Sequence, residues 1–261
     1  MFWWQILLLS VIEGLTEFLP VSSTGHLIFL SNLLVIDDSS FRTTFEISIQ
    51  VGTIMSVIFL YWRLFLLNWK ILLRLGLAFL PAGIIGFIFY NFITSYLMVN
   101  LYIIAWALIL GGFFMIISEK WYKKQEVDNE DDISKISLKK VFFIGCCQSV
   151  ALIPGVSRSA ATIVGGLWSK LNRKQAVEFS FLLAVPIMAV AGFYDFYKQA
   201  DYFTTDQFVF LFWGFILSFT TGVLAIKLFL AFIKRYDFIP FGLYRIVIGL
   251  VILSMLYLSL I

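Results

Sequence analysis

Long apolar stretches constrain the fold of this chain more than any other feature of its sequence. A helix needs about 20 apolar residues to cross the bilayer core, and six segments approach or exceed that length. The composition agrees, because 61% of the residues are hydrophobic and only 13% are charged, against about 45–50% and about 25% in soluble domains. We therefore predict an all-α polytopic membrane protein rather than a soluble enzyme, a disordered chain or a disulfide-stapled domain. The predicted spans are residues 45–62, 75–90, 96–117, 179–197, 207–233 and 239–261.

Two further apolar stretches, residues 1–36 and 141–168, are interrupted by helix breakers and charges. Pro20 interrupts the first stretch, and Pro154 followed by Gly155 interrupts the second. Each limb of the second stretch has about 14 residues, so as a helix it is about 21 Å long against a core of about 30 Å. We therefore predict two re-entrant helix pairs, which enter the membrane and return to the same side. Broken backbone at that depth must be surrounded by protein or by a water-filled cavity.

Lysine and arginine are distributed unevenly among the predicted loops, and cytoplasmic loops of membrane proteins carry the excess of both. The loops on one side hold only Arg42 and Lys198. With both broken segments re-entrant, every basic loop falls on the other side, which we assign to the cytoplasm. The first broken segment then enters from outside and the second from inside. The basic loops lie near residues 62–75, 118–140, 169–178 and 234–238.

This topology predicts an internal repeat of inverted orientation within a single membrane domain, residues 1–261. Residues 1–117 and 141–261 each contain a re-entrant pair followed by three spans, and residues 118–140 form a cytoplasmic linker between them. Inverted repeats of this kind place a polar site near the midplane. The net charge is only +3, which is not typical of nucleic-acid binding. The aromatic-rich surface is compatible with a homodimer.

The first broken segment concentrates polar chemistry in EGLTEFLPVSSTGH. Glu13 and Glu17 are four residues apart on one helix face, where two carboxylates suit a divalent metal or a general acid/base pair. We expect Pro20 to end this helix, and Ser23 or Thr24 to cap the next one. Ionisable groups at membrane depth are functional by default. Three hydroxyls, a glycine and the single histidine follow the proline: Ser22, Ser23, Thr24, Gly25 and His26.

The second broken segment, QSVALIPGVSRSAATI, has the composition of an anion site. A helix N-terminus with hydroxyls and an arginine fits phosphate oxygens. Arg158 could instead neutralise Glu13 or Glu17 across the repeat interface, since buried charges are usually paired. That pair could also occupy an empty phosphate site. A second intramembrane arginine, Arg245, is expected near a span end or paired with an acid. The turn contains Gly155, Ser157, Arg158 and Ser159.

Together the two turns supply an acid pair, a hydroxyl, a histidine and a phosphate clamp. That set fits phosphoryl transfer to water better than transport alone. Since no soluble substrate-binding face is predicted, the substrate should be a lipid. The alternative is a secondary transporter or lipid flippase, because inverted repeats are common among transporters.

At these residues the chain resembles the bacterial undecaprenyl-pyrophosphate phosphatases of the BacA/UppP type, which are associated with bacitracin resistance. The resemblance covers the whole chain. One departure is Ala160, which stands where the family usually has glycine. The matching motifs are EGLTEFLPVSSTGHL (Glu13 to Leu27), PGVSRSAATI (Pro154 to Ile163) and EFSFLLAVP (Glu178 to Pro186).

The resemblance implies hydrolysis of undecaprenyl diphosphate to the monophosphate used in peptidoglycan synthesis. It also implies a divalent cation and a site that faces outward from the bacterial inner membrane. The implied working set is Glu13, Glu17, Ser23, His26 and Arg158. The other residues expected to bind substrate beside Glu13 are Ser22, Thr24, Gly25, Gly155, Ser157 and Ser159.

Roles within this set are hypotheses. Arg158 would bind the diphosphate. Ser23 would attack phosphorus, with His26 or Glu17 accepting its proton. Glu13 and Glu17 would hold Mg²⁺ or Ca²⁺. Attack by His26 itself, through a phosphohistidine, and direct attack by an activated water are the two rival mechanisms.

Overall fold

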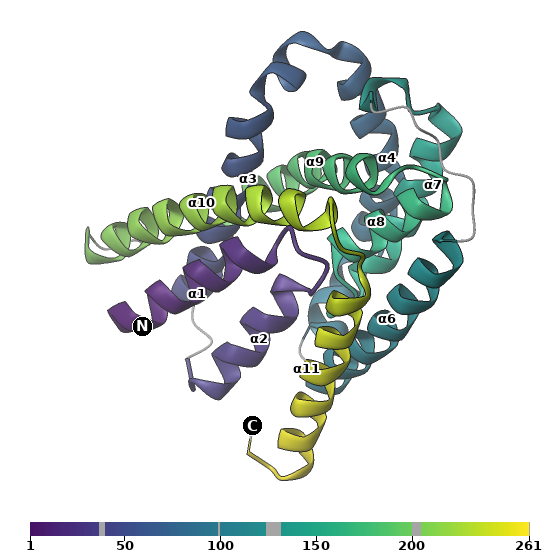
Figure 1. Ribbon diagram of the computed structural model, residues 1–261. Helices are drawn as coiled ribbons and strands as arrows, with labels where there is room; N and C mark the ends of the chain where they lie inside the picture. The colour runs from purple at the N-terminus through teal and green to yellow at the C-terminus, as the bar shows by residue number, and fades with distance from the viewer. Residues whose placement is uncertain (37–39, 99, 124–131, 200–204, 261) are drawn as a thin grey trace.

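The computed structural model describes residues 1–36, 40–98, 100–123, 132–199 and 205–260, with the backbone alone at residues 40, 191–199, 205 and 206. These residues form helices and connecting turns, and no strand occurs among them (Figure 1). The predicted all-α class is therefore confirmed. The helices are α1 (Trp3–Thr16), α2 (Ser23–Leu33), α3 (Ser40–Leu67), α4 (Trp69–Ile88), α5 (Tyr90–Phe92), α6 (Leu101–Tyr122), α7 (Leu138–Ser149), α8 (Arg158–Trp168), α9 (Arg173–Gln199), α10 (Thr205–Ile233) and α11 (Ile239–Tyr257). Three short turns complete them: a π-helix at Ile93–Leu97 and 3-10 helices at Ile133–Lys135 and Val150–Leu152.

Five helices of the described chain are long and apolar enough to cross a membrane, so the protein is a multi-pass membrane protein. They correspond to five of the six predicted spans, although the predicted starts at residues 75 and 96 were wrong. The linker predicted from residue 118 begins later, because α6 continues to Tyr122. The sixth predicted span falls within the 27-residue α9, which is not among the five, and its crossing stays a prediction. The five candidate spans are Phe41–Leu67, Trp69–Ile88, Leu101–Tyr122, Gln207–Ile233 and Ile239–Tyr257.

Both interrupted stretches fold as two short helices joined by a turn, as predicted. Helices α1 and α2 have 14 and 11 residues, and α7 and α8 have 12 and 11. At a rise of about 1.5 Å per residue, each is about 16–21 Å long, which is too short for a core of about 30 Å. The turn of each pair is largely buried inside the protein, and α2 and α8 begin at these turns.

The helices that follow the two turns start in the same way. Ser22 caps α2 with a φ of 73°, and its side chain accepts a hydrogen bond from the backbone N–H of Gly25 at 3.3 Å. Ser157 caps α8 with a φ of 72° and accepts from the N–H of Ala160 at 3.2 Å. Positive φ costs a non-glycine residue on the order of 1–3 kcal/mol. The prediction that Ser23 or Thr24 caps α2 was wrong, because the chain enters the helix one residue earlier.

The first helix of each broken pair packs on a long helix from the other half of the chain. Helix α1 lies along α10, and α7 lies along α4 (Figure 1). Helices α3 and α9 also pack together, as do α6 and α11. The two turns are therefore held between elements of both halves of the sequence.

Gly14 sets the distance between α1 and α10. A Cβ atom added there would lie 2.0 Å from Oγ1 of Thr221 and 2.6 Å from the carbonyl oxygen of Ser218. We expect Gly14→Ala to lower the free energy of unfolding by about 1–3 kcal/mol, because the helices must separate. Thermal melting of the detergent-solubilised protein measures this. Gly76→Ala on α4 is the matched control, since a Cβ there meets nothing within 4 Å. Equal melting temperatures for the two variants would show that the α1–α10 contact is not tight.

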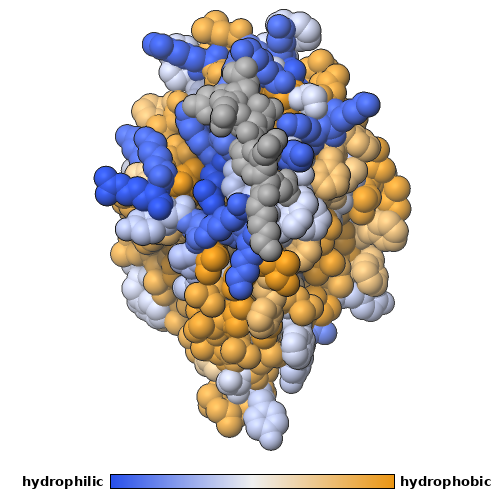
Figure 2. Space-filling view, turned by 45° about the vertical axis from the view of Figure 1, so that its right-hand side comes forward, coloured by the Kyte–Doolittle hydropathy of each residue, from blue (hydrophilic) through white to orange (hydrophobic). Residues whose placement is uncertain are grey.

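Hydrophilic side chains gather over one region of the surface, and most of the rest of the visible face is hydrophobic (Figure 2). Ion pairs join separate elements of the fold. Lys123, after α6, lies 2.6 Å from Asp237 in the α10–α11 turn, and Arg173 of α9 pairs with the buried Glu119 of α6. Partial burial raises the pKa of Asp237. Hydrogen bonds from Lys123 and the N–H of Ile239, together with the positive charges of Lys123 and Arg173, outweigh this effect and hold the pKa below its usual range.

Candidate active site

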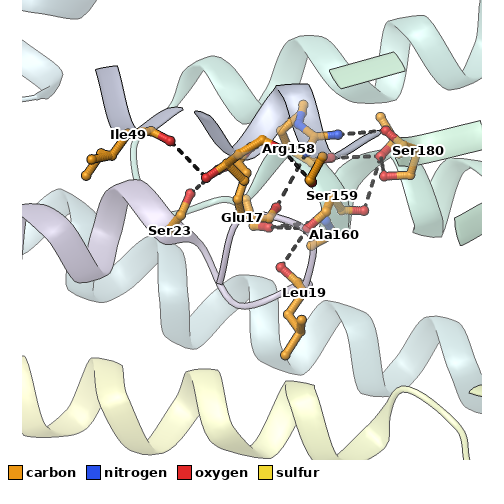
Figure 3. A network of polar contacts seen from close by, with 12 residues as sticks. Glu17, Leu19, Ser23, Ile49, Arg158, Ser159, Ala160 and Ser180 are labelled. Carbon is orange, nitrogen blue, oxygen red and sulfur yellow. Dashed lines mark hydrogen bonds and ion pairs between the residues drawn. The ribbon is translucent and has the colours of Figure 1, made fainter. Parts of the chain in front are cut away.

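Glu17, Ser23 and Arg158 meet between the two turns. Glu17 follows the last residue of α1, and Ser23 and Arg158 are the first residues of α2 and α8. The Ser23 hydroxyl donates to Oε2 of Glu17, and Nη2 of Arg158 lies 3.1 Å from Oε1 of the same carboxylate (Figure 3). The Glu17 and Arg158 side chains are only 9% and 12% exposed. Three predicted site residues, of which Arg158 is far from the other two in sequence, therefore form one buried polar cluster.

The remaining contacts of Arg158 fix the plane of its guanidinium. Its Nη1 donates to the carbonyl of Ser180 on α9 at 2.7 Å. The Ser180 hydroxyl accepts from Thr162, one turn further along α8, also at 2.7 Å. Ser159 donates to the carbonyl of Leu19 at 2.8 Å and so joins α8 to the first turn (Figure 3). With Nη1 held by α9, the fork presents Nη2 to the carboxylate of Glu17.

The cluster lies at the N-termini of two helices. The first backbone N–H groups of a helix have no partner within it, and the helix dipole favours anions there. Helices α2 and α8 both begin at these residues. A phosphoryl group that replaced the Glu17 carboxylate on Arg158 would therefore meet a guanidinium and two helix starts. The sequence also allowed an ion pair between Arg158 and Glu17, and the structure contains that pair. In it, the Glu17 carboxylate takes the position on Arg158 that a phosphate would take.

His26 contacts α11. Its Nδ1 lies 2.8 Å from the carbonyl oxygen of Ser22, and its Nε2 lies 2.8 Å from the hydroxyl of Tyr244. The two rings are nearly parallel, with their centroids 5.6 Å apart. Both ring nitrogens are therefore engaged, and in the described contacts the Ser23 hydroxyl bonds Glu17 rather than His26.

Glu13 lies one helical turn before Glu17 and is fully buried. Neither of its carboxylate oxygens has a hydrogen-bond partner among the described residues. Two unpartnered oxygens beside a second carboxylate fit a hard cation such as Mg²⁺ or Ca²⁺, which takes oxygen ligands. No group of three or more His, Cys, Asp or Glu side chains that could hold a metal occurs among these residues. Water and phosphate oxygens would complete the coordination of such a cation.

The other predicted binding residues mainly shape the turns. Ser22 and Ser157 are the caps, and the Ser157 hydroxyl lies 3.1 Å from that of Ser159. Gly155 has a φ of +92°, and a Cβ there would lie 2.6 Å from the Ile104 carbonyl. Ala160, which replaces the expected glycine, donates its N–H to Ser157 and fits in a buried position. Gly25 makes the equivalent bond to Ser22, while Thr24 is half-buried beside it.

Arg245 holds both turns together and was missed as a site residue. Its guanidinium is fully buried and donates to the carbonyls of Pro20 at 3.4 Å, Ala107 at 3.2 Å and Gly155 at 2.9 Å. No carboxylate of the described chain pairs with it, contrary to the expectation of an acidic partner or a place near a span end. One cation from α11 thus connects the first turn, the second turn and α6.

Fold and site define a class: multi-pass helical membrane proteins with a polar site built between two broken helix pairs. Within this class, the chain belongs to the family described as bacitracin resistance protein BacA, whose family model matches residues 6–251. The resemblance drawn from the sequence is thereby confirmed.

Similar proteins named undecaprenyl-diphosphatase cover nearly the whole chain. The protein from Persephonella marina is 49% identical over 249 residues, which are 95% of this chain and 97% of its own length. The relative from Sulfurihydrogenibium sp. is 46% identical, over 94% and 96% of the two lengths. The relative from Aquifex aeolicus is 45% identical, over 95% and 96%.

Proposed function

We propose that this protein hydrolyses undecaprenyl diphosphate to undecaprenyl phosphate and inorganic phosphate. The reaction recycles the lipid carrier for peptidoglycan synthesis and confers bacitracin resistance. Relatives at 45–49% identity carry this activity in their names. The observation that carries the proposal is the contact of Ser23, Glu17 and Arg158, because it places a hydroxyl, a base and a phosphate-binding cation on adjoining atoms.

In the proposed reaction, the diphosphate binds Arg158 and displaces the carboxylate of Glu17 from it. The Ser23 oxygen attacks the terminal phosphorus, its proton passes to Glu17, and the bond from that phosphorus to the bridging oxygen breaks. Undecaprenyl phosphate leaves, and water then hydrolyses the phosphoserine. The existing hydrogen bond from Ser23 to Glu17 supports this assignment over attack by His26, whose nitrogens are held by Ser22 and Tyr244. Direct attack on the terminal phosphorus by a water molecule that Glu17 activates is the remaining rival mechanism.

A divalent cation would be held by Glu13 and Glu17. It would supply positive charge to the diphosphate oxygens. The buried, unpartnered oxygens of Glu13 support this part of the proposal. Arg158 and the two helix starts would orient the anion, and the surrounding buried side chains would exclude bulk water.

The proposed topology has six spans and two re-entrant pairs in inverted repeats, the first ending with α6 and the second beginning with α7, joined by the linker between them. The similar serine caps at Ser22 and Ser157 support it, as does the reciprocal packing of α1 on α10 and α7 on α4. We place the protein in the bacterial inner membrane with its basic loops in the cytoplasm. Access to the site from outside is what the family resemblance implies.

Transport of a polyprenyl phosphate is the second candidate, and the repeated architecture favours it. A binding site alone would need the arginine and the helix starts. It would not need a hydroxyl hydrogen-bonded to a carboxylate, as Ser23 is to Glu17. The hydrolase therefore accounts for more of the site.

Phosphate release from undecaprenyl diphosphate by the purified protein in detergent tests the proposal. We expect release with Mg²⁺ or Ca²⁺, none after EDTA, and one phosphate per lipid with the monophosphate as product. Protein heated beyond its unfolding temperature serves as the blank. Folded protein that binds the lipid yet releases no phosphate under any metal condition would contradict hydrolysis and favour transport.

A further inference from the structure

An apolar groove of about 480 Å³ opens beside the polar cluster. It lies between the end of α1 and the turn after it, the second half of α10 and the first half of α11. Its volume is within the range of ligand sites, about 300–1,000 Å³. The lining residues are Leu15, Thr16, Leu19, Val21, Ala225, Leu228, Phe229, Phe232, Pro240, Phe241 and Tyr244.

The walls of this groove offer nothing to a polar ligand. No charged side chain lines it, and only Thr16 and Tyr244 carry polar side-chain atoms. Thr16 donates its hydroxyl to the carbonyl of Ile12 at 2.6 Å. The Tyr244 hydroxyl is 2.8 Å from Nε2 of His26. Because both are engaged and a polar occupant would lose its hydrogen bonds to water, a hydrocarbon fits best.

The groove borders the turn that joins two of the site residues, Glu17 and Ser23. Leu19 and Val21 line the groove, and both belong to the turn between Glu17 and Ser22. The carbonyl of Leu19 accepts the hydroxyl of Ser159, so one residue faces the groove and also binds the second turn. Tyr244 places its ring in the groove wall and its hydroxyl on His26. A molecule with its polar end at Arg158 could therefore continue into the groove without leaving the protein.

We infer that this groove binds the first isoprene units of the lipid substrate, an inference that rests on the proposed function. The chain would run from the polar cluster toward the α10–α11 turn. That turn carries exposed Lys234 and Arg235, so the charge rule places it at the cytoplasmic surface. The hydrocarbon chain thus leaves the site toward the inner leaflet, although the diphosphate is reached from outside.

Variants that block the groove test this inference, because they should weaken the preference of the protein for long-chain over short-chain diphosphates. In Ala225→Trp and Leu228→Trp an indole would enter the groove from α10. Leu224→Trp is the matched control, because Leu224 is exposed on the same helix and does not line the groove. We expect the two groove variants to lower kcat/KM for undecaprenyl diphosphate relative to a one-isoprene diphosphate by at least about tenfold. The control should keep the wild-type ratio. Ala225 is buried, so Ala225→Trp alone could misfold. Leu228 is 58% exposed, so Leu228→Trp should fold and still fill the groove.

A second measurement does not depend on hydrolysis. A polyprenyl monophosphate with a benzophenone in its first isoprene units should cross-link to α10 near residues 225–232 in the wild type. Leu228→Trp should reduce this labelling, and Leu224→Trp should not. Cross-links elsewhere, or an unchanged chain-length ratio in both groove variants, would overturn the inference while hydrolysis stands. Wild-type protein that labels at the groove but releases no phosphate would instead contradict the proposed function.

Discussion

Replacement of Arg158 by alanine is expected to lower kcat/KM for undecaprenyl diphosphate by about 10²–10³-fold, the range found when one preorganised donor to developing charge is removed. The guanidinium is anchored by Nη1 on the Ser180 carbonyl at 2.7 Å and directs Nη2 to Glu17 at 3.1 Å. Without it, Glu17 loses its cationic partner and the arriving phosphate loses its clamp. Phosphate release under steady-state conditions gives the value.

Arg158→Lys separates charge from geometry. A lysine ammonium keeps the charge but cannot bind two acceptors in one plane, so we expect most of the loss to persist. Arg63→Ala is the control, because Arg63 is exposed near the end of α3 and contacts the ring of Trp62. Activity of Arg158→Ala within about threefold of wild type would remove Arg158 from the binding machinery.

Substitution of Glu17 by glutamine is expected to lower kcat by about 10²–10⁴-fold, the usual contribution of a general base. Glutamine has the same shape but cannot accept the proton of Ser23, and its amide would place a donor against Arg158. Ser23→Ala should lose a similar factor. Since the two residues act as one unit, the double variant should be no worse than the poorer single variant.

The activities of the three variants distinguish attack by Ser23 from direct attack by water. If water attacks directly, Ser23→Ala should retain most of its activity while Glu17→Gln does not, and no phosphoserine should be trapped on rapid acid quench. Asp237→Asn is the matched control, because Asp237 is an ion-paired carboxylate remote in sequence from the motifs. Full activity in Glu17→Gln would contradict both the serine and the water mechanisms that use this base.

Much of the site could be predicted from the sequence, because helix breakers and polar residues occur together at the two turns. Pro20 breaks one apolar stretch, and Pro154 with Gly155 breaks the other. Because each resulting limb is too short to cross the membrane, the sequence predicts a turn at each break. Glu17, Ser23 and Arg158 are polar groups at those breaks, and burial in a membrane drives such groups together. Their contact across 141 residues of sequence therefore follows from topology rather than from any local signal.

Other features depend on backbone detail that hydropathy does not contain. Helices α4 and α6 start at residues set by the caps Asn68 and Asn100, whose side chains accept from Ile71 and Tyr102. Apolar windows overlook such caps, although asparagine is a recognised start signal. Arg245 was missed for a different reason. Its partners are backbone carbonyls, which every residue has, so no pairing pattern could reveal them.

Ser22 and Ser157 enter their helices with nearly the same φ, 73° and 72°, yet the residues that follow them differ. Ser23 supplies a hydroxyl in one half, and Arg158 supplies a guanidinium in the other. An ancestral pair of identical halves would have presented two hydroxyls or two guanidiniums, and neither set contains both a nucleophile and an anion clamp. If the halves arose by gene duplication, hydrolysis of the kind proposed here became possible only after the copies diverged at this position. Anion binding or transport could then be the older activity.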